Sequence, residues 1–356
     1  MWRISDKQVV RSFTGHLGGI SCLIHLDQIS LRLIASGSKD KSIILWDLGN
    51  SSPKRVLKGH KGEVTRILHL EGYLDDQSIV SSSVDSFIKI WNINRGDCLI
   101  TLTSHLDRVL NIFHFPKYDT NNLISASKDK TIKIWNISED DVVKQVIVNI
   151  KNKEEIVVFH ANYDKKNEML NLIAILSDKS LKIWQGPEYK DSGFKLRGHY
   201  YSINCVTQFT SVEQILTGSE DKTIKLWNIY KNKNTSSFHG TCKGKESKGH
   251  KDGILKIIHL KGFDDDIIAS SSRDGSIKLW NTRSKKMVKT LCDQKYHNFY
   301  HKSLCFRSDF TVCKGHIDQI HDFIFVLANG EYKIISCSAD KTIRIWELDK
   351  NTESKE

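Results

Sequence analysis

The sequence predicts an all-β protein assembled from seven copies of one small unit of short strands. Seven of the eight tryptophans recur at a spacing of 43 to 66 residues. An aspartate stands six residues before each of these seven tryptophans, and Ser or Thr stands ten residues before six of them. Alternating, β-branched segments of strand length lie in each copy. A phrase kept at such a period indicates an array of one supersecondary unit. The seven tryptophans are Trp46, Trp91, Trp135, Trp184, Trp227, Trp280 and Trp346.

The third copy shows the elements of the unit in order. An apolar, β-branched run predicts a first strand, and a polar loop separates it from a second strand. A tight turn follows, in which the Asp129 carboxylate can accept backbone N–H bonds. A third strand contains Trp135, and a weaker fourth strand follows, as in the second copy. We expect these elements at 108–115 (strand), 117–122 (loop), 123–127 (strand), 128–130 (turn), 131–136 (strand) and, in the second copy, 97–103 (strand).

Composition and charge narrow the class of protein. The chain has 356 residues and a formal net charge of +11, and no apolar run approaches the ~18–20 residues that span a bilayer. The N-terminus does not resemble a secretory leader, so we expect a cytoplasmic or nuclear protein with reduced cysteines. The charge favours acidic protein surfaces, RNA or ribosomes as partners. A lysine-rich proteome would give the same charge without any such partner.

A Gly-His pair stands 22 to 25 residues before the aspartate in five copies. The third copy has Ser104-His105 instead, and the fourth has Lys151-Asn152 at the aligned place. Together these residues form seven registered copies of GH…S-x-x-x-D-x₅-W, and over nearly all of its length the chain resembles the WD40-repeat family. The Trp-Asp dipeptide after which the family is named occurs in only one of the seven copies, as Trp46-Asp47.

This resemblance implies a seven-bladed β-propeller of four-stranded antiparallel blades. It also implies a buried hydrogen-bond chain of His, Ser or Thr, Asp and Trp within each blade, which stabilises only when every member is satisfied. The fourth copy has Asn152 and Ala174 in this pattern, so we expect its chain to be absent and its blade to be the loosest. The structural network would comprise His16, Ser36, Asp40, Trp46, His60, Ser81, Asp85, Trp91, His105, Ser125, Asp129, Trp135, His199, Thr217, Asp221, Trp227, His250, Ser270, Asp274, Trp280, His316, Ser336, Asp340 and Trp346.

The two ends of the chain indicate how the ring closes. Residues 8–13 precede the first Gly-His pair and read as a fourth strand without its first three, while the last copy stops after its third strand. We therefore expect the N-terminal strand to complete the C-terminal blade, which removes an open sheet edge. A single propeller would then occupy 1–349, with a polar tail at 350–356 and no room for a second domain.

Family geometry places two classes of loop on one face, here called the top face: those between the second and third strands, and those between successive blades. Lysines flank the aspartate in most of these turns, which predicts a basic rim, although solvated turn lysines would look the same. The insert 292–314, between the sixth and seventh repeats, mixes aromatic and basic residues, which make contact anchors or stack on bases unless the loop buries its own aromatics. The candidate partner-binding residues are Lys39, Lys61, Arg108, Lys128, Tyr200, Lys251, Arg273, Tyr296, Phe299, Tyr300 and Arg307.

We expect no catalytic, cofactor or metal site. The chain has no glycine-rich phosphate loop of either major type. The His-to-Asp pairing recurs six times at one register, whereas a catalytic site needs one copy. The insert contains Cys and His residues, but their C-x₄-H-x₃-H-x₃-C spacing matches no common zinc motif.

These observations predict a non-enzymatic scaffold or adaptor that mediates protein–protein interactions. It would be a monomeric propeller within a larger hetero-complex, without membrane insertion, and its surface would carry the function. An RNA- or ribosome-associated propeller is an alternative, because of the net charge and the basic, aromatic insert. A substrate receptor of a ubiquitin ligase is a further alternative, although no docking element for a ligase is recognisable.

Overall fold

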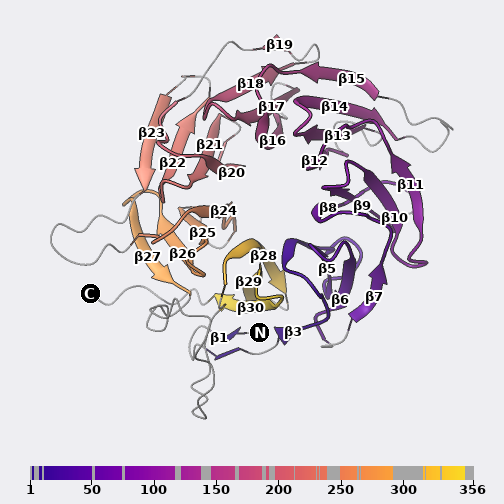
Figure 1. Ribbon diagram of the computed structural model, residues 1–356. Coiled ribbons are helices and arrows are strands. Elements are labelled where there is room, and N and C mark those ends of the chain that lie inside the picture. The colour runs from indigo at the N-terminus through magenta and orange to yellow at the C-terminus, as the bar shows by residue number, and fades with distance from the viewer. Residues whose placement is uncertain are drawn as a thin grey trace, which may run out of the picture.

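Seven β-sheets surround a central channel in the computed structural model of the chain (Figure 1). Six sheets have four strands, and the sheet that contains both chain ends has six. This arrangement confirms the predicted all-β, seven-bladed propeller. The structure describes residues 2–3, 8–9, 12–49, 53–73, 77–116, 122–137, 146–164, 168–186, 190–191, 197–211, 213–229, 231, 233–238, 249–262, 264, 266–291, 316, 318–328 and 331–348.

Each blade is an antiparallel meander whose first strand lines the channel and whose last strand lies outermost (Figure 1). The first three blades are β4 (Ile20–His25), β5 (Leu33–Ser38), β6 (Ile43–Asp47) and β7 (Pro53–Leu57); β8 (Val64–His69), β9 (Ser78–Ser83), β10 (Ile88–Asn92) and β11 (Cys98–Leu102); and β12 (Val109–His114), β13 (Asn122–Ser127), β14 (Thr131–Asn136) and β15 (Val146–Lys151).

The next three blades repeat this order, and blade four has a longer inner hairpin than its neighbours. These blades are β16 (Ile156–Asp164), β17 (Met169–Leu176), β18 (Leu181–Gln185) and β19 (Lys190–Asp191); β20 (Ile203–Gln208), β21 (Gln214–Ser219), β22 (Ile224–Asn228) and β23 (Lys233–Phe238); and β24 (Ile254–His259), β25 (Ile267–Ser272), β26 (Ile277–Asn281) and β27 (Lys286–Thr290).

Blade seven joins the two ends of the chain and closes the ring, as predicted. It contains β28 (Ile320–Ala328), β29 (Glu331–Ser338) and β30 (Ile343–Leu348) together with three two-residue N-terminal strands. The prediction of one continuous strand over residues 8–13 is wrong in detail. β3 (Ser12–Phe13) pairs antiparallel with β30, and β1 (Trp2–Arg3) takes the next part of the same edge in parallel, so β2 (Gln8–Val9) pairs with β1 instead.

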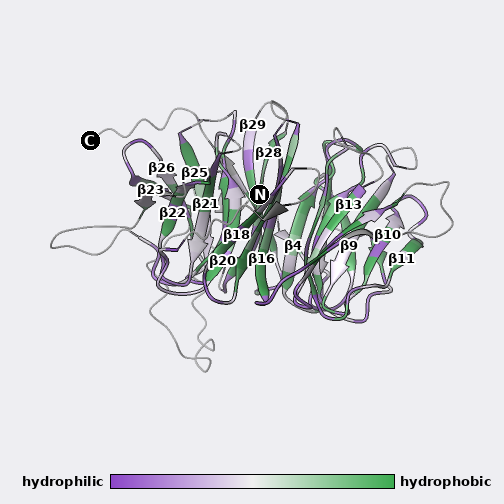
Figure 2. Ribbon diagram, turned by 90° about the horizontal axis from the view of Figure 1, so that it is seen from above, coloured by the Kyte–Doolittle hydropathy of each residue, from purple (hydrophilic) through white to green (hydrophobic). Residues whose placement is uncertain are grey.

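Apolar packing joins consecutive blades. All seven motif tryptophans are 0–3% exposed, and each packs against the blade that precedes its own. Trp91 of blade two is buried with Leu45 of blade one, and Trp46 of blade one is buried with Ile343 of blade seven. The strands are accordingly rich in hydrophobic residues, while hydrophilic residues occupy many of the connecting turns (Figure 2).

The innermost strand of every blade carries a β-bulge at the same place. The ladder shifts register after Ile20, Val64, Val109, Ile156, Ile203, Ile254 and Ile320. A bulge places an extra residue on one strand and re-aims the side chains beside it. The seven bulges therefore form a ring around the channel and determine which side chains reach into it.

No helix in the described ranges is long and apolar enough to cross a bilayer. The insert 292–314 and the tail 350–356 lie outside the described residues.

Candidate functional site

A buried hydrogen-bond chain links two top-face loops to the tryptophan of the same blade. In blade three, His105 Nδ1 donates to Asp129 Oδ2 over 2.8 Å and His105 Nε2 lies 2.7 Å from Ser125 Oγ. Trp135 Nε1 donates to the same Ser125 hydroxyl over 2.7 Å. In this arrangement Ser125 accepts from the indole and donates to the imidazole, so every member of the chain has a partner.

The same chain occurs in six blades, with His–Asp distances of 2.7 to 3.0 Å. Burial by itself would raise the pKa of Asp40 and Asp85, but hydrogen bonds from Ser42 and His60, respectively, outweigh it and lower each pKa to about 2. Bonds from histidine likewise hold the pKa of the other network aspartates well below the usual range: Asp129, Asp221, Asp274 and Asp340. The carboxylates therefore stay ionised and fix the loops above them.

Blade four departs from this arrangement. Asp178 accepts from Ser180 and pairs with Arg197 at 3.3 Å, while Asn152 stands where the other blades have the histidine. A different polar chain runs through this blade, in which Gln185 Nε2 donates to Asn171 Oδ1 over 2.9 Å and Asn171 Nδ2 donates to Asn162 Oδ1 over 3.0 Å. Whether blade four is the loosest stays a prediction.

Replacing Asp129 with alanine is expected to destabilise the protein by about 2–3 kcal/mol, because His105 and the Leu106 and Thr131 backbone N–H groups lose their acceptor. The matched control is Asp178→Ala, at the same repeat position but without a histidine partner, which should cost under about 1 kcal/mol. Urea unfolding at neutral pH measures both. Equal losses from the two variants would refute an energetic role for the histidine network.

The residue after the motif histidine stands out from the top face and is anchored from below. The backbone N–H groups of Leu17, Leu106 and Tyr200 donate to the network aspartates of their blades over 2.8, 3.0 and 3.1 Å. Their side chains are nevertheless 85%, 90% and 81% exposed. Rigid backbone with exposed apolar side chains is a favourable combination for binding, since little further ordering is needed.

Leu17 and Leu106 are absent from the residues predicted for partner binding, whereas Tyr200 is among them. The sequence held a signal that could have found them, because the position after the motif histidine recurs in the six repeats that have this histidine. Lysine occupies it at Lys61 and Lys251, both exposed and both anchored by their backbone N–H to the network aspartate. The top face therefore alternates apolar and basic residues at equivalent positions.

The other predicted contact residues fall into four groups. Lys39 and Lys128 are exposed in the top turns. Arg273 is partly occupied, because its two terminal nitrogens pair with Glu220 over 2.7 and 2.8 Å. Arg108 is half-buried and lines the channel instead of the rim. The remaining members lie outside the described residues: Tyr296, Phe299, Tyr300 and Arg307.

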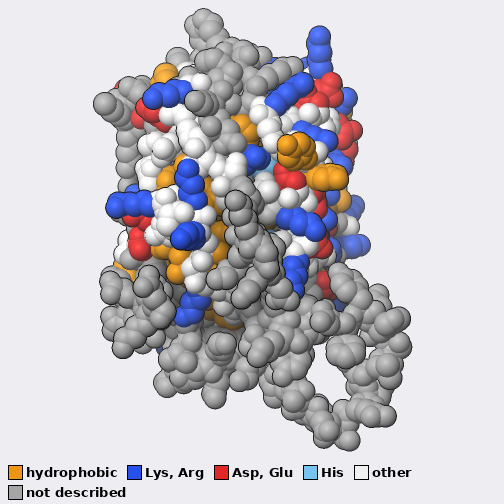
Figure 3. Space-filling view, turned by 90° about the vertical axis from the view of Figure 1, so that its left-hand side faces the viewer, with side chains coloured by type: hydrophobic (Ala, Val, Ile, Leu, Met, Phe, Trp, Pro, Cys, Tyr) orange, Lys and Arg blue, Asp and Glu red, His pale blue; other side chains and the backbone are white. Residues whose placement is uncertain are grey.

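The lysines that follow the aspartate have a backbone role. The residue at this position has a φ between 66° and 73° in all seven blades, and it is lysine in five of them. Lys130 Nζ donates to the carbonyl of Lys153 over 3.1 Å, and Lys179 Nζ donates to the carbonyl of Tyr200 over 2.9 Å. These two lysines thus connect neighbouring blades. On the side shown in Figure 3, the Lys and Arg side chains of the described residues have Asp and Glu side chains among them.

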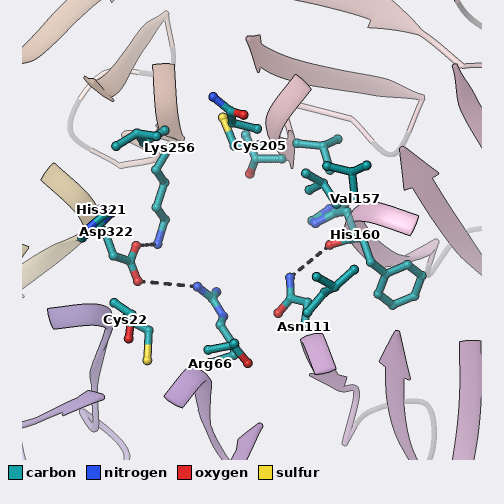
Figure 4. Close-up of a pocket in the computed structure, with 18 of the residues that line it drawn as sticks. Cys22, Arg66, Asn111, Val157, His160, Cys205, Lys256, His321 and Asp322 are labelled. Carbon is teal, nitrogen blue, oxygen red and sulfur yellow. Dashed lines mark hydrogen bonds and ion pairs between the residues drawn. The ribbon is translucent and has the colours of Figure 1, made fainter. Parts of the chain in front are cut away.

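The central channel holds a charged cluster at the level of the bulges. Asp322 of blade seven pairs with Lys256 of blade six and lies 3.6 Å from Arg66 of blade two (Figure 4). The same carboxylate accepts the Leu23 N–H of blade one over 3.0 Å. These groups line a cavity of about 520 Å³ that also includes Arg108. One carboxylate thereby links four blades around the seam where the ring closes.

Burial lowers the pKa of His160 in this cavity to about 4, and the positive charge of Arg66 adds to the effect. Burial also lowers the pKa of His321 to about 4, with a contribution from the charge of Lys39. Both imidazoles are therefore neutral near pH 7. Within the described ranges, no group of three or more His, Cys, Asp or Glu side chains is placed to hold a metal ion.

Comparison with known proteins agrees with this geometry. The model of the "WD domain, G-beta repeat" family matches residues 7–47, 51–92, 96–136, 191–228, 240–281 and 308–347, and thus skips blade four. WD40 domains are usually non-catalytic, and the matched segments contain no catalytic domain.

Individual relatives are distant. Kinesin-like protein KIF21B of Homo sapiens is 25% identical over 98% of this chain and 17% of its own length. Protein tipD of Dictyostelium discoideum is 27% identical over 81% of this chain and 43% of its own length. The p21-activated protein kinase-interacting protein 1-like of Danio rerio is 25% identical over 78% of this chain and 67% of its own length. The chain thus spans less than half of the first two relatives. Since the family model covers more than half of it, the chain belongs to the WD40-repeat family.

Proposed function

We propose that this chain is a non-enzymatic scaffold or adaptor of the cytoplasm or nucleus that binds a partner protein on its top face, as a subunit of a larger complex. The observation that carries the proposal is the set of exposed side chains Leu17, Leu106 and Tyr200, each fixed by a backbone bond to a network aspartate. WD40 propellers generally bind proteins, and one relative is named as a kinase-interacting protein.

The chemistry of this face suggests the character of the partner. Apolar and aromatic anchors lie beside the exposed cations Lys39, Lys61, Lys128 and Lys251. Anchors of this kind contribute most of the affinity of a protein interface, while the surrounding charges steer association. A partner surface with apolar pockets and acidic side chains around them fits this arrangement. Arg273 and the insert 292–314 border the same face in the proposal, whereas Arg108 lies in the channel.

Two matched triple variants test the proposal by quantitative mass spectrometry of proteins recovered with each. The top-face variant is Leu17→Ser, Leu106→Ser and Tyr200→Ser. The control variant removes exposed apolar side chains elsewhere: Leu31→Ser, Val56→Ser and Val288→Ser. We expect recovery of the specific partners to fall at least about 100-fold for the top-face variant, because the loss of even two hot-spot side chains at about 2 kcal/mol each exceeds that factor, and to change little for the control. Partner loss confined to the control would contradict the proposal.

The net charge of +11 favours the alternative function, association with RNA or ribosomes, and this alternative has a test of its own. Binding to random RNA should weaken steeply with salt if phosphate contacts supply the affinity. A response that stays flat from about 50 to 200 mM salt would exclude that alternative and leave the protein-binding function as the explanation of the charged rim.

A further inference from the structure

Two arginine side chains in the channel carry buried donors that no acceptor in the described ranges satisfies. The Nε atoms of Arg66 and Arg108 are buried and make no hydrogen bond. Arg66 approaches Asp322 only at 3.6 Å, and Arg108 forms no ion pair with any residue that the structure describes. Burying a donor without an acceptor is unfavourable, and a guanidinium cannot avoid it by losing a proton, because its pKa is above ~12. A ligand with several hydrogen-bond acceptors would therefore stabilise each of these two guanidinium groups.

A third unpaired group faces the same cavity from the next blade. His160 Nε2 is buried without a partner, and the edge of its ring packs against Phe113 with the centroids 5.4 Å apart. Arg66 precedes Asn111 and His160 around the ring, on β8, β12 and β16, and Figure 4 shows all three reaching inward. The Asn111 amide is already engaged with the Phe159 carbonyl over 3.0 Å. These three unpaired atoms thus belong to blades two, three and four, and a fourth, His321 Nε2, borders the same cavity from blade seven.

The charges of the cavity wall favour an anion. Three permanent cations line the cavity, Arg66, Arg108 and Lys256, against two carboxylates, Glu63 and Asp322. Asp322 is shared among Lys256, Arg66 and the backbone N–H groups of Leu23 and Phe323, so it compensates Arg66 only in part and forms no ion pair with Arg108. The volume of about 520 Å³ falls within the range typical of small-molecule sites.

We propose that the channel is a binding site for a small phosphate-bearing anion, held by the guanidinium groups of Arg66 and Arg108 with the Nε2–H of His160. Planar guanidinium groups match phosphate oxygens in a bidentate geometry, which is the strongest class of hydrogen bond available here. The anion supplies acceptors to all three unpaired donors. It offsets the surplus positive charge of the wall without displacing Lys256 from Asp322. This site lies below the proposed partner-binding face and does not depend on it.

Isothermal titration calorimetry of the full chain with inorganic phosphate, pyrophosphate and ribose 5-phosphate at matched ionic strength tests the proposal. We expect one saturable site per chain. Arg108→Gln should weaken binding at least about 10-fold, since two charge-assisted hydrogen bonds are lost. The affinity of Arg108→Lys should lie between those of the unmodified chain and Arg108→Gln, because lysine keeps the charge but lacks the two parallel N–H donors of a guanidinium. Arg108 is the best position for substitution, because it takes no part in the Asp322 cluster. Lys128→Gln, an exposed cation outside the cavity, is the matched control and should bind like the unmodified chain.

The three probes also distinguish the source of the anion. Tighter binding of ribose 5-phosphate than of inorganic phosphate indicates a phosphorylated organic ligand, and equal binding indicates the free anion. Two outcomes overturn the proposal. One is the absence of saturable binding up to about 10 mM of every probe, which means that water alone satisfies the donors. The other is equal weakening by Arg108→Gln and Lys128→Gln, which means that the anions bind diffusely to the basic surface.

Discussion

Replacing Asp322 with alanine is expected to lower the free energy of unfolding by about 3–5 kcal/mol. The substitution leaves Lys256 and Arg66 in the channel without their carboxylate. It also removes the acceptor of the Leu23 N–H, 299 residues away in the sequence, at the seam between blades seven and one. The loss arises from uncompensated buried charge as well as from the missing bonds.

Urea unfolding, compared with that of the exposed control Asp27→Ala, measures this effect. The loss of stability of Asp322→Asn should lie between those of Asp322→Ala and Asp27→Ala, since asparagine keeps one oxygen acceptor but loses the charge. The control should change stability by under about 0.5 kcal/mol, as expected for an exposed turn residue. A loss below about 1 kcal/mol for Asp322→Ala would show that the cluster contributes little to holding the ring closed.

Acidification is expected to destabilise the protein in two stages. His160 and His321 have a folded-state pKa of about 4 against an ordinary value of 6.5, so the unfolded chain binds more protons between these two values. Stability is therefore complete above about pH 6.5 and falls as the pH drops toward 4, by about 3 kcal/mol for each histidine. The network aspartates follow: for Asp40 and Asp85, stability is lost as the pH falls from about 4 to about 2.

Urea unfolding midpoints measured between about pH 7.5 and pH 3 follow both stages. The double variant His160→Gln and His321→Gln should show a smaller loss of stability between about pH 6.5 and pH 4 than the unmodified chain, because the groups responsible are gone. Its loss below about pH 4 should remain, since the aspartates are unchanged. A midpoint that is constant down to about pH 4.5 in the unmodified chain would contradict the assignment of these two histidines.

The sequence was sufficient for the framework because the framework repeats. The Asp–Trp phrase marks the third strand of each blade, and the Gly-His position marks the loop before each first strand. The ends of the chain were harder to predict. Three two-residue N-terminal strands share the closing blade, and their choice of edge depends on β30, more than 300 residues away.

The channel could not be predicted, since its chemistry comes from residues that the repeat does not constrain. Arg66, Lys256 and Asp322 lie at the equivalent bulge position of three blades, yet their types differ from blade to blade. Only ring closure brings them together. The exposed residues Leu17 and Leu106 were missed for another reason, because their position after the motif histidine recurs but the residue type at that position changes between repeats. Their significance appears once the backbone N–H bonds to the aspartates place them on the top face.

The most direct test of the proposed binding face is lysine acetylation footprinting by mass spectrometry, on the chain alone and with a recovered partner bound. The exposed lysines of the top face should lose reactivity in the complex: Lys39, Lys61, Lys128 and Lys251. Lys54 on β7 and Lys286 on β27, both exposed on outermost strands, should react equally in both states. Protection of Lys54 and Lys286 with unchanged reactivity of the top-face lysines would contradict the account and place the partner on the outer edge of the ring.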